Sequence, residues 1–414
     1  MKQVLVSMLI LFLPGLVHAQ TTERIVALDS ILKYADEHAY ILKIDDKRIL
    51  QNELLKNRPL HTPNTSMGME YGNINSAFND TRFFLNQGIQ LPVVYKRQKE
   101  VYQKNIEIEQ ARRYYNQAEL HLSIRQLAYK IMDLDRRAKI LDEIENNFKE
   151  WRRIAQIQTS QGEIKKSVFN EIDFQFNQNR IQKEQLLADR SQLVYELKLL
   201  TNSIEAFVPI LEEVSSSVLT PLTIENGFVQ HPSIQFSNAV IEERKAQVLV
   251  NKTKLIPDVN LGYSNLSIIG WQTPDGVSQK YYGAGRRFGV YQFGLSLPLF
   301  NGSTKAKIKT AELDVEIAQL EQSRQTALLN AQLSKLISKY QQAQKSYQYF
   351  QNEGLPISNE LYQQASVRLK NGDISFSEWN VLVAQALQIK LSLVSSIYEI
   401  QVAMAEFNYL TEKN

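Results

Sequence analysis

The sequence predicts a mainly α protein that has a small β part and consists of two tandem copies of one structural unit. No proline or glycine occurs between Pro92 and Gly162, so this stretch predicts one very long helix that ends at a turn. A second such stretch runs from Ser303 to Glu353, and a second turn glycine follows at Gly372. Self-similarity in a fixed order indicates two copies of one unit of about 190 residues.

Residues 1–19 have the features of a secretory signal peptide. Lys2 precedes an apolar stretch from Val4 to Val17, and Ala19 ends a small-residue cleavage site. The apolar stretch is shorter than the ~20 residues that a spanning helix needs, so a membrane anchor is the less favoured alternative. We expect no other stretch of the chain to approach that length.

Composition excludes several classes of protein. The 47 basic and 44 acidic residues are interspersed, so nucleic acid is not expected as a partner. A mean hydropathy of -0.31 argues against a bundle of membrane-spanning helices. The chain has no cysteine, which excludes disulfides, thiolate metal sites and lipidation of a cysteine. If this protein enters a bilayer, strands must do so.

The first repeat, residues 20–206, is predicted to hold a helix, a β-hairpin and a long helical hairpin. Apolar residues at three- and four-residue spacing predict an amphipathic helix over 22–57. Alternating apolar and polar residues predict a hairpin within 65–92. A helix over 95–157 follows, with leucines at seven-residue spacing as in coiled coils. Gly162 is expected to form the tip before a return helix.

The second repeat, residues 223–414, repeats this order after a linker over 207–222. It is predicted to hold a helix over 224–254, a hairpin within 258–299, and a second helical hairpin with its tip near Gly372. A break is expected at Gly354, which precedes Leu355-Pro356. The loop of this hairpin, residues 270–287, is longer than that of the first, as is usual at one end of a barrel.

Four strands with one apolar face predict an assembly. An open sheet in lipid leaves unpaired backbone groups, each costing several kcal/mol. Closure by two chains gives eight strands with a filled interior, whereas three chains give a twelve-stranded barrel with a water-filled bore. A soluble sheet packed on helices is the alternative. The residues predicted to face lipid are Met69, Tyr71, Leu85, Ile89, Leu91, Leu261, Tyr263, Tyr291, Phe293, Leu295 and Leu297.

The opposite face of these strands is predicted to be polar and to line water. Its residues include Gln90, Gly262, Ser264, Gln292 and Ser296. Four aromatic residues in or near the second hairpin loop are candidates for an interfacial girdle, with loop packing as the alternative for the first three: Trp271, Tyr281, Tyr282 and Tyr291.

The chain resembles the TolC-type outer-membrane efflux proteins of the outer membrane factor family. The likeness is carried by Gly88-Ile89-Gln90-Leu91-Pro92, Gly294-Leu295-Ser296-Leu297-Pro298 and the helix tip from Arg368 to Gln385. It covers the whole mature chain. The resemblance implies a homotrimer, with a twelve-stranded barrel in the outer-membrane lipid of a Gram-negative bacterium and a long α-barrel in the periplasm. It also implies two partners, a periplasmic adaptor (membrane fusion) protein and an inner-membrane pump of the RND type.

The resemblance also implies a periplasmic gate of acidic residues after the second tip. Glu378 is the best match to it, and Asp373 is a weaker one. The next acidic position of the family falls on Val381, and the first repeat has Val168 where the second has Glu378, which puts a second acidic ring in doubt. The alternative for Glu378 is an exposed residue near a helix N-terminus, which the helix dipole favours.

The two tips resemble the surface on which the family docks its adaptors. The residues concerned are Gly162 and Glu163 in the first tip, and Gly372 and Asp373 in the second. Any helical hairpin needs a glycine at its turn, so the turn role follows from the residues and the docking role from the resemblance.

No catalytic motif, phosphate-binding loop or cofactor site is recognisable, so the protein is not expected to be an enzyme, and no metal site is expected because the histidines stand far apart. We expect a passive conduit that exports small molecules, either drugs or metal ions. The alternatives are the outlet of a type I protein secretion system and a periplasmic coiled-coil scaffold without a pore.

Overall fold

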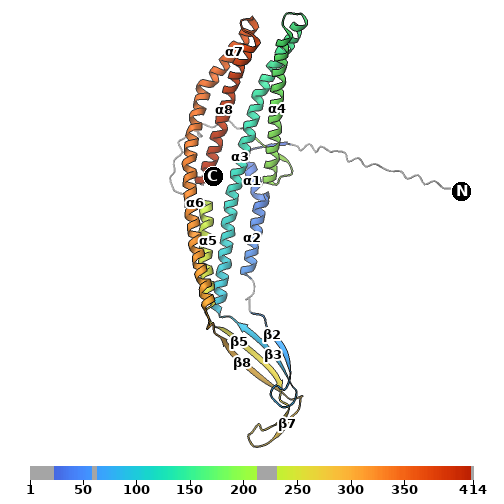
Figure 1. Ribbon diagram of the computed structural model, residues 1–414, viewed down its shortest axis with the longest axis vertical. Coiled ribbons are helices and arrows are strands. Elements are labelled where there is room, and N and C mark those ends of the chain that lie inside the picture. The colour runs from blue at the N-terminus through green and yellow to red at the C-terminus, as the bar shows by residue number, and fades with distance from the viewer. Residues whose placement is uncertain (1–22, 58–62, 212–230, 412–414) are drawn as a thin grey trace, which may run out of the picture. The chain divides into compact units, whose positions relative to one another are not determined.

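The computed structural model describes residues 23–57, 63–211 and 231–411 (Figure 1). The predicted signal peptide, residues 1–19, lies outside them, as do residues 212–222 of the predicted linker and the start of the helix expected from 224. The predicted mainly α fold with a small β part is confirmed. The elements are β1 (Glu23–Val26), α1 (Leu28–His38), α2 (Tyr40–Lys56), β2 (Ser66–Gly72), β3 (Asp80–Ile89), α3 (Pro92–Ser160), α4 (Lys166–Thr201), β4 (Ala206–Pro209), α5 (Pro232–Thr253), β5 (Asp258–Ser267), β6 (Gly270–Gln272), β7 (Lys280–Tyr282), β8 (Arg287–Ser296), α6 (Gly302–Tyr349), η2 (Phe350–Gly354), α7 (Leu355–Asn371) and α8 (Phe376–Thr411).

The long helices match the stretches that lack proline and glycine. Helix α3 has 69 residues and starts at Pro92, where the missing N–H of proline costs no helical hydrogen bond. The break expected at Gly354 is a π-helical turn, η2, after which the chain remains helical. A Cβ on Gly354 would lie 3.1 Å from the Ile389 side chain, so the glycine also allows α8 to pack closely.

The N-terminal region differs from the single helix expected over 22–57. Helices α1 and α2 are separated by Ala39, whose ψ of 132° is extended. Strand β1 precedes them and pairs in parallel with β4, with Glu23 opposite Ala206. Strand β4 therefore occupies part of the stretch expected to be a linker. Both strands have four residues, too few for their alternation to stand out from noise.

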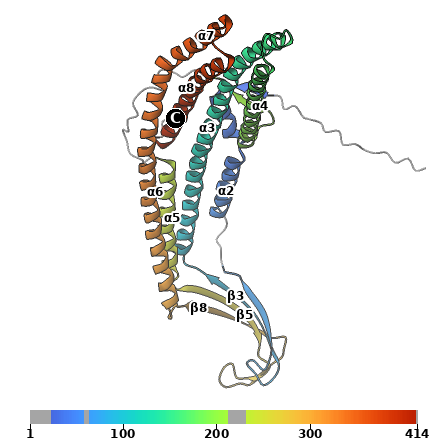
Figure 2. The same ribbon diagram turned by 45° about the horizontal axis from the view of Figure 1, so that its top comes forward.

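The four predicted hairpin strands form one antiparallel sheet in the order β2-β3-β5-β8 (Figure 2). Residues that face each other across adjacent strands share a side of the sheet. Met67 lies opposite Leu85, Leu85 opposite Tyr263, and Tyr263 opposite Tyr291. This register places apolar residues of all four strands on one face, as the alternation predicted. Strands β6 and β7 form a separate small sheet in the second hairpin loop.

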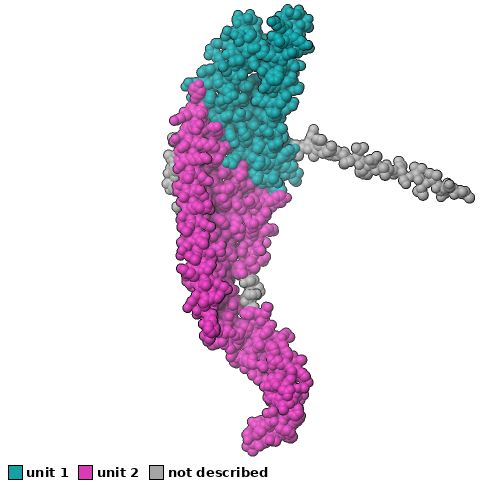
Figure 3. All heavy atoms as spheres, in the orientation of Figure 1, with its two compact units in different colours: residues 1–38, 124–214, 350–398 teal, residues 39–123, 215–349, 399–414 magenta. Residues whose placement is uncertain are grey.

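The chain divides into two compact units (Figure 3). Unit 1 comprises residues 1–38, 124–214 and 350–398, and unit 2 comprises 39–123, 215–349 and 399–414. Each unit takes segments from both sequence repeats. Unit 1 holds the two helix tips, and unit 2 holds the four-stranded sheet.

Each unit has its own apolar core. The core of unit 1 contains Phe148, Ile172, Trp379 and Val383, which come from α3, α4 and α8. The core of unit 2 is built from α5, α6 and the end of α8, and its buried residues are Ile234, Leu329, Leu333, Leu336, Tyr340, Ala343, Ile400, Ala403, Phe407 and Leu410. The long helices are thus held laterally by neighbouring helices.

Helix α8 is apolar enough to span a membrane by length and composition, the one such helix within the described residues. The expectation that no stretch after the N-terminus approaches that length is therefore wrong. The apolar residues of α8 supply the helical cores instead, because Trp379, Ile400 and Ala403 have no exposed surface.

Candidate functional site

The two helix tips, which are the predicted docking surface, have the same backbone turn. Gly162 and Gly372 have φ values of 75° and 76°, in the left-handed region that favours glycine. The N–H of Gly372 donates to the carbonyl of Leu369, and the N–H of Asp373 donates to that of Arg368 (2.9 Å). Glu163 and Gly162 make the equivalent bonds. Both tips are Schellman motifs, which satisfy the last carbonyls of α3 and α7.

Glu378, the predicted gate residue, lies in the first turn of α8 and caps it. Its Oε2 accepts hydrogen bonds from the backbone N–H of Ser375 (2.8 Å) and from the Ser375 hydroxyl (2.9 Å). The Glu378 N–H donates to Ser375 Oγ (3.2 Å), which completes a reciprocal capping box. The bond from the Ser375 N–H, then that from its hydroxyl, and the charge of Arg368 lower the pKa of Glu378. The carboxylate is exposed and ionised at neutral pH.

The first tip lacks this capping box. Its N-cap is Lys165, whose side chain makes no capping hydrogen bond, and Val168 stands where the second tip has Glu378. The two tips therefore share a turn but differ in their first helical turn. Asp373, the weaker gate candidate, is exposed beside Gly372.

An aromatic cluster lies between the helical hairpins of unit 1, below the tips. The ring of the fully buried Trp379 lies 5.5 Å from that of Phe148 and 5.8 Å from that of Trp151. Phe376 contacts Trp379 as well, at 5.2 Å. Trp379 thus connects α3 to the start of α8. This cluster is not predicted from the sequence above, although its four members form two pairs at three-residue spacing, Phe148 with Trp151 and Phe376 with Trp379.

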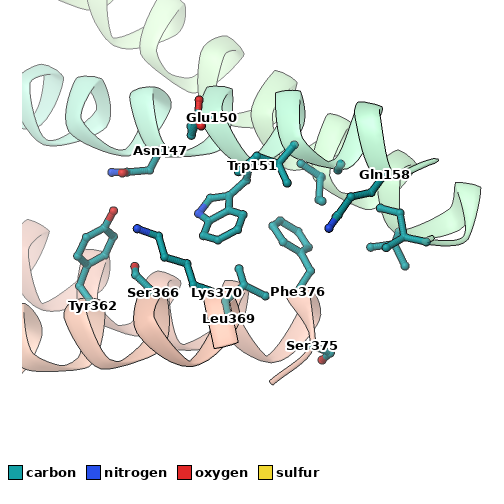
Figure 4. Close-up of a pocket in the computed structure, with 15 residues that line it drawn as sticks. Asn147, Glu150, Trp151, Gln158, Tyr362, Ser366, Leu369, Lys370, Ser375 and Phe376 are labelled. Carbon is teal, nitrogen blue, oxygen red and sulfur yellow. The ribbon is translucent and has the colours of Figure 1, made fainter. Parts of the chain in front are cut away.

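A cavity of about 750 Å³ adjoins this cluster, between α3, α4 and α7. Trp151 and Phe376 project into it from opposite sides, as Figure 4 shows. Lys370, Asn147 and Tyr362 also line it, so that its wall has both apolar and polar parts.

Polar contacts tie the helices of unit 1 together. The Ser377 hydroxyl donates to the Glu171 carboxylate (2.8 Å), which links α8 to α4. Arg152 pairs with Asp173 (2.5 Å), and Lys183 pairs with Glu145 (2.7 Å), both between α3 and α4. Such pairs contribute modestly to stability when exposed, but they fix which faces of neighbouring helices meet.

The eleven residues predicted to face lipid are all exposed. Their exposed fractions range from 36% for Ile89 and Leu91 to 83% for Phe293. Nine lie in the strands with one phase, Leu91 lies two residues after the end of β3, and Leu297 directly follows β8. Met67 and Phe83 belong to the same face and extend it, as the same alternation indicates.

The opposite face is mainly polar in the half next to the helices and mixed in the other half. In the half next to the helices, Asn260 donates to Ser296 (2.7 Å), and a Cβ on Gly262 would collide with the side chains of Asn86 and Gln292. The expectation that Ser264 lines water is wrong, because only 1% of it is exposed. It lies between the larger Phe84 and Val290 on the neighbouring strands.

The aromatic residues of the second hairpin loop divide between different surroundings. Trp271 and Tyr281 pack on each other in the β6–β7 sheet, with ring centroids 5.6 Å apart. Tyr282 contacts Phe288 (5.4 Å), whereas Tyr291 contacts Tyr263 on the apolar face (5.3 Å). Only Tyr291 therefore lies on the face that a lipid girdle requires. Within the described residues, no group of three or more His, Asp or Glu side chains is placed to hold a metal ion.

Comparison with known proteins gives one family match and several structures of similar fold. Residues 224–405, which make up most of the second repeat, match the outer membrane efflux protein family. A search of curated proteins gives no match.

Solved structures match over nearly the full length. The outer-membrane channel OprN matches with a TM-score of 0.76 and 16% identity, over 94% of this chain and 90% of OprN. The outer membrane protein VceC of Vibrio cholerae matches with a TM-score of 0.71 and 12% identity, over 93% of this chain and 95% of VceC. The CmeC outer membrane channel of Campylobacter jejuni matches with a TM-score of 0.69 and 16% identity, over 93% and 85%. OprN and CmeC are described as outer-membrane channels, and VceC as an outer membrane protein.

Proposed function

Because residues 224–405 match the outer membrane efflux protein family and the chain has the fold of outer-membrane channels, we propose that this protein is the outer-membrane component of a tripartite efflux system. It is a passive conduit for small molecules, either drugs or metal ions. The observation that carries the proposal is the exposed apolar face that runs without interruption across β2, β3, β5 and β8.

This sheet needs further copies of itself. Strands β2 and β8 are its two edges, and in hydrocarbon their unpaired N–H and C=O groups would each cost several kcal/mol. Three copies close twelve strands around a water-filled bore, which the polar half of the other face lines. In this proposal, residues 20–206 and 223–414 are two copies of one unit, and each contributes one β-hairpin and one helical hairpin.

An exposed apolar stripe on α4 supports the same assembly. Phe174, Ile181, Ala188 and Tyr195 recur at every seventh residue, and all four are exposed. Seven-residue spacing is that of a helix packed along another helix, and large exposed apolar patches mark interaction sites. In the homotrimer, a helix of the neighbouring protomer covers this stripe.

The proposed partners are those that the resemblance to outer-membrane efflux proteins implies. The channel lies in the outer membrane of a Gram-negative bacterium and extends into the periplasm, where a periplasmic adaptor docks on the tips around Gly162, Glu163, Gly372 and Asp373. An inner-membrane pump of the RND type supplies the energy. The alternative in the same fold is the outlet of a type I protein secretion system. Neighbouring genes for an ABC exporter, in place of a proton-driven pump, would favour it.

The proposal is tested by location, assembly and conductance. We expect heat-resistant trimers in the outer-membrane fraction and discrete conductance steps when the purified protein is added to a planar lipid bilayer. A soluble periplasmic monomer would overturn the proposal. A trimer that never conducts would favour a scaffold without a pore.

We propose further that three Glu378 carboxylates, with Asp373 beside them, make the periplasmic mouth favour cations. The capping box holds the carboxylate in place while leaving it exposed. Glu378→Gln separates the two roles of this residue, because glutamine also forms capping boxes but carries no charge.

We expect Glu378→Gln to reduce the preference for cations, measured as the reversal potential in a salt gradient. Ser375→Ala is the matched control, since it weakens the cap by about 1 kcal/mol and keeps the charge. Unchanged selectivity in Glu378→Gln would remove Glu378 from the gate.

A further inference from the structure

In the half that is farther from the helices, the second face of the sheet carries an apolar cluster beside the Arg82–Glu70 ion pair (3.4 Å). Beyond Ser264, this face carries Phe84, Val290, Leu266 and Phe288. Leu266 lies opposite Phe288 in the register, and only 8% of it is exposed. A bore that only conducts water has no need of such residues, since polar ones line the other half of the same face.

The β6–β7 hairpin adds to this patch. It lies beyond the ends of the four strands, on the side away from the helices (Figure 1). Tyr282 of β7 contacts Phe288 edge to face, with the ring planes at 88°. Tyr282 therefore lies on the side of the sheet that carries Phe288, opposite to the face predicted to meet lipid.

Two basic side chains accompany these rings. The Lys280 ammonium lies 5.7 Å from the centre of the Tyr282 ring, and the Arg286 guanidinium lies 5.9 Å from that of Phe288. Both are exposed, so each aromatic ring carries a cation on its solvent side.

The direction of this loop is fixed at its base by a buried carboxylate. Asp80 has no exposed surface and accepts hydrogen bonds from the N–H of Ile269 (2.9 Å) and the hydroxyl of Ser267 (3.3 Å). It also accepts one from the N–H of Asn75 in the loop of the first hairpin (3.2 Å). Arg287 of β8 binds Asn265 on the adjacent strand β5 and Thr81 on β3, the strand beyond it. Both hairpin loops are thus attached to one another where the insertion begins.

From this arrangement we propose that Phe84, Leu266, Tyr282, Phe288 and Val290 form an apolar collar that narrows the outer mouth of the channel, with Lys280 and Arg286 as a cationic rim. The inference rests on the proposed function, which makes this face the wall of the bore. Three protomers repeat the collar around the bore. Apolar constrictions hinder water and ions by dewetting, and charged rings select by sign.

The chain's lack of cysteine allows a direct test from outside the cell. Ser296→Cys places one thiol on the same face, on the helix side of the collar. A bulky maleimide that cannot cross the membrane is then added to whole cells, and its rate of reaction is measured. The periplasmic gate does not affect this measurement, because the reagent enters through the outer mouth.

We expect Tyr282→Ser and Phe288→Ser to accelerate labelling of the Ser296→Cys protein several-fold. Tyr281→Ser is the matched control, because Tyr281 is the neighbouring residue in β7 but packs on Trp271. It should leave the rate unchanged. If Phe288→Ser does not assemble, Tyr282→Ser in the exposed hairpin carries the test. Equal rates in Tyr282→Ser, Tyr281→Ser and the unmodified background would overturn the collar.

The cationic rim is tested separately, by comparing the labelling rates of an anionic and a neutral maleimide. Lys280→Glu combined with Arg286→Glu should slow an anionic maleimide by roughly tenfold relative to a neutral one, since local charge changes encounter rates by at least this much. Equal slowing of both reagents would overturn the cationic rim. Heat-resistant trimers are measured for every variant. Their absence from the unmodified protein would defeat the proposed channel itself, whereas intact trimers with unchanged labelling defeat only the collar.

Discussion

At the residue scale, Glu378 combines a structural role with an exposed charge. Its carboxylate accepts a hydrogen bond from the backbone N–H of Ser375 at the start of α8, and it also stays in contact with water. Its lowered pKa means that this contribution to stability is present above the pKa of the unfolded chain and is lost as the pH falls through the folded pKa. The capping bonds therefore act throughout the neutral range in which the proposed gate works.

His231 is a second residue whose charge state matters. It is the N-cap of α5, where its Nδ1 accepts a hydrogen bond from the Ser233 N–H (3.2 Å), and 1% of it is exposed. The ring of Tyr409 meets it edge to face at 5.0 Å, and the Tyr409 hydroxyl donates to Glu119. Burial lowers the pKa of His231 to about 4, while the charge of Glu119 acts in the opposite sense.

This lowered pKa predicts a loss of stability in mild acid. Below about pH 6.5 the unfolded chain binds a proton at this histidine and the folded chain does not, so stability falls as the pH decreases toward 4. The loss at pH 5 should be about 2 kcal/mol.

His231→Asn keeps an N-cap acceptor and removes the titration. We expect it to flatten the decline of the unfolding midpoint between pH 7 and pH 5. An equally steep decline in His231→Asn would assign the acid sensitivity to other groups.

At the element scale, each strand has one face predicted to meet lipid and one predicted to line the bore. Because side chains alternate along a strand, neighbouring residues lie on different faces. Phe293 is the most exposed of the residues predicted to face lipid, and Gln292 beside it lies on the polar half of the other face. The pair allows the lipid face to be tested with one substitution on each side of a single strand.

We expect Phe293→Arg to destabilise the assembled protein by about 2–4 kcal/mol if the residue lies near the bilayer midplane. Gln292→Arg should be tolerated, because its side chain meets water. The measurement is the temperature at which the trimer dissociates in detergent. Equal tolerance of both changes would contradict a lipid-facing role for β8.

At the scale of the whole molecule, the chain has exposed apolar surfaces and open sheet edges that it does not cover by itself. The sheet keeps two open edges, and the stripe on α4 keeps exposed apolar residues at seven-residue spacing. The open edges and the exposed stripe are energetically unfavourable in a monomer. An assembly of identical chains around one axis pairs the edges and covers the stripe. We therefore expect folding and assembly to be tightly linked.

The stripe predicts a specific assembly defect. Ile181→Glu places a charge within it and should abolish the heat-resistant trimer, because an unpaired charge would be buried at the interface. Gln182→Glu makes the same change in charge on the next residue, which is exposed and lies off the stripe, and should leave the trimer intact. Trimers of normal heat resistance in Ile181→Glu would place the interface elsewhere.

The sequence by itself determined the repeat, the long helices, the two glycine turns and the apolar face of the four strands. All of these are set by local patterns: the absence of helix breakers, periods of seven and of two residues, and backbone conformations that favour glycine. Tertiary structure alone decided the pairing of β1 with β4, the apolar cluster on the outer half of the second sheet face and the contact of Trp379 with Phe148 and Trp151. Those features join segments far apart in the chain, and local patterns do not specify which distant segments meet.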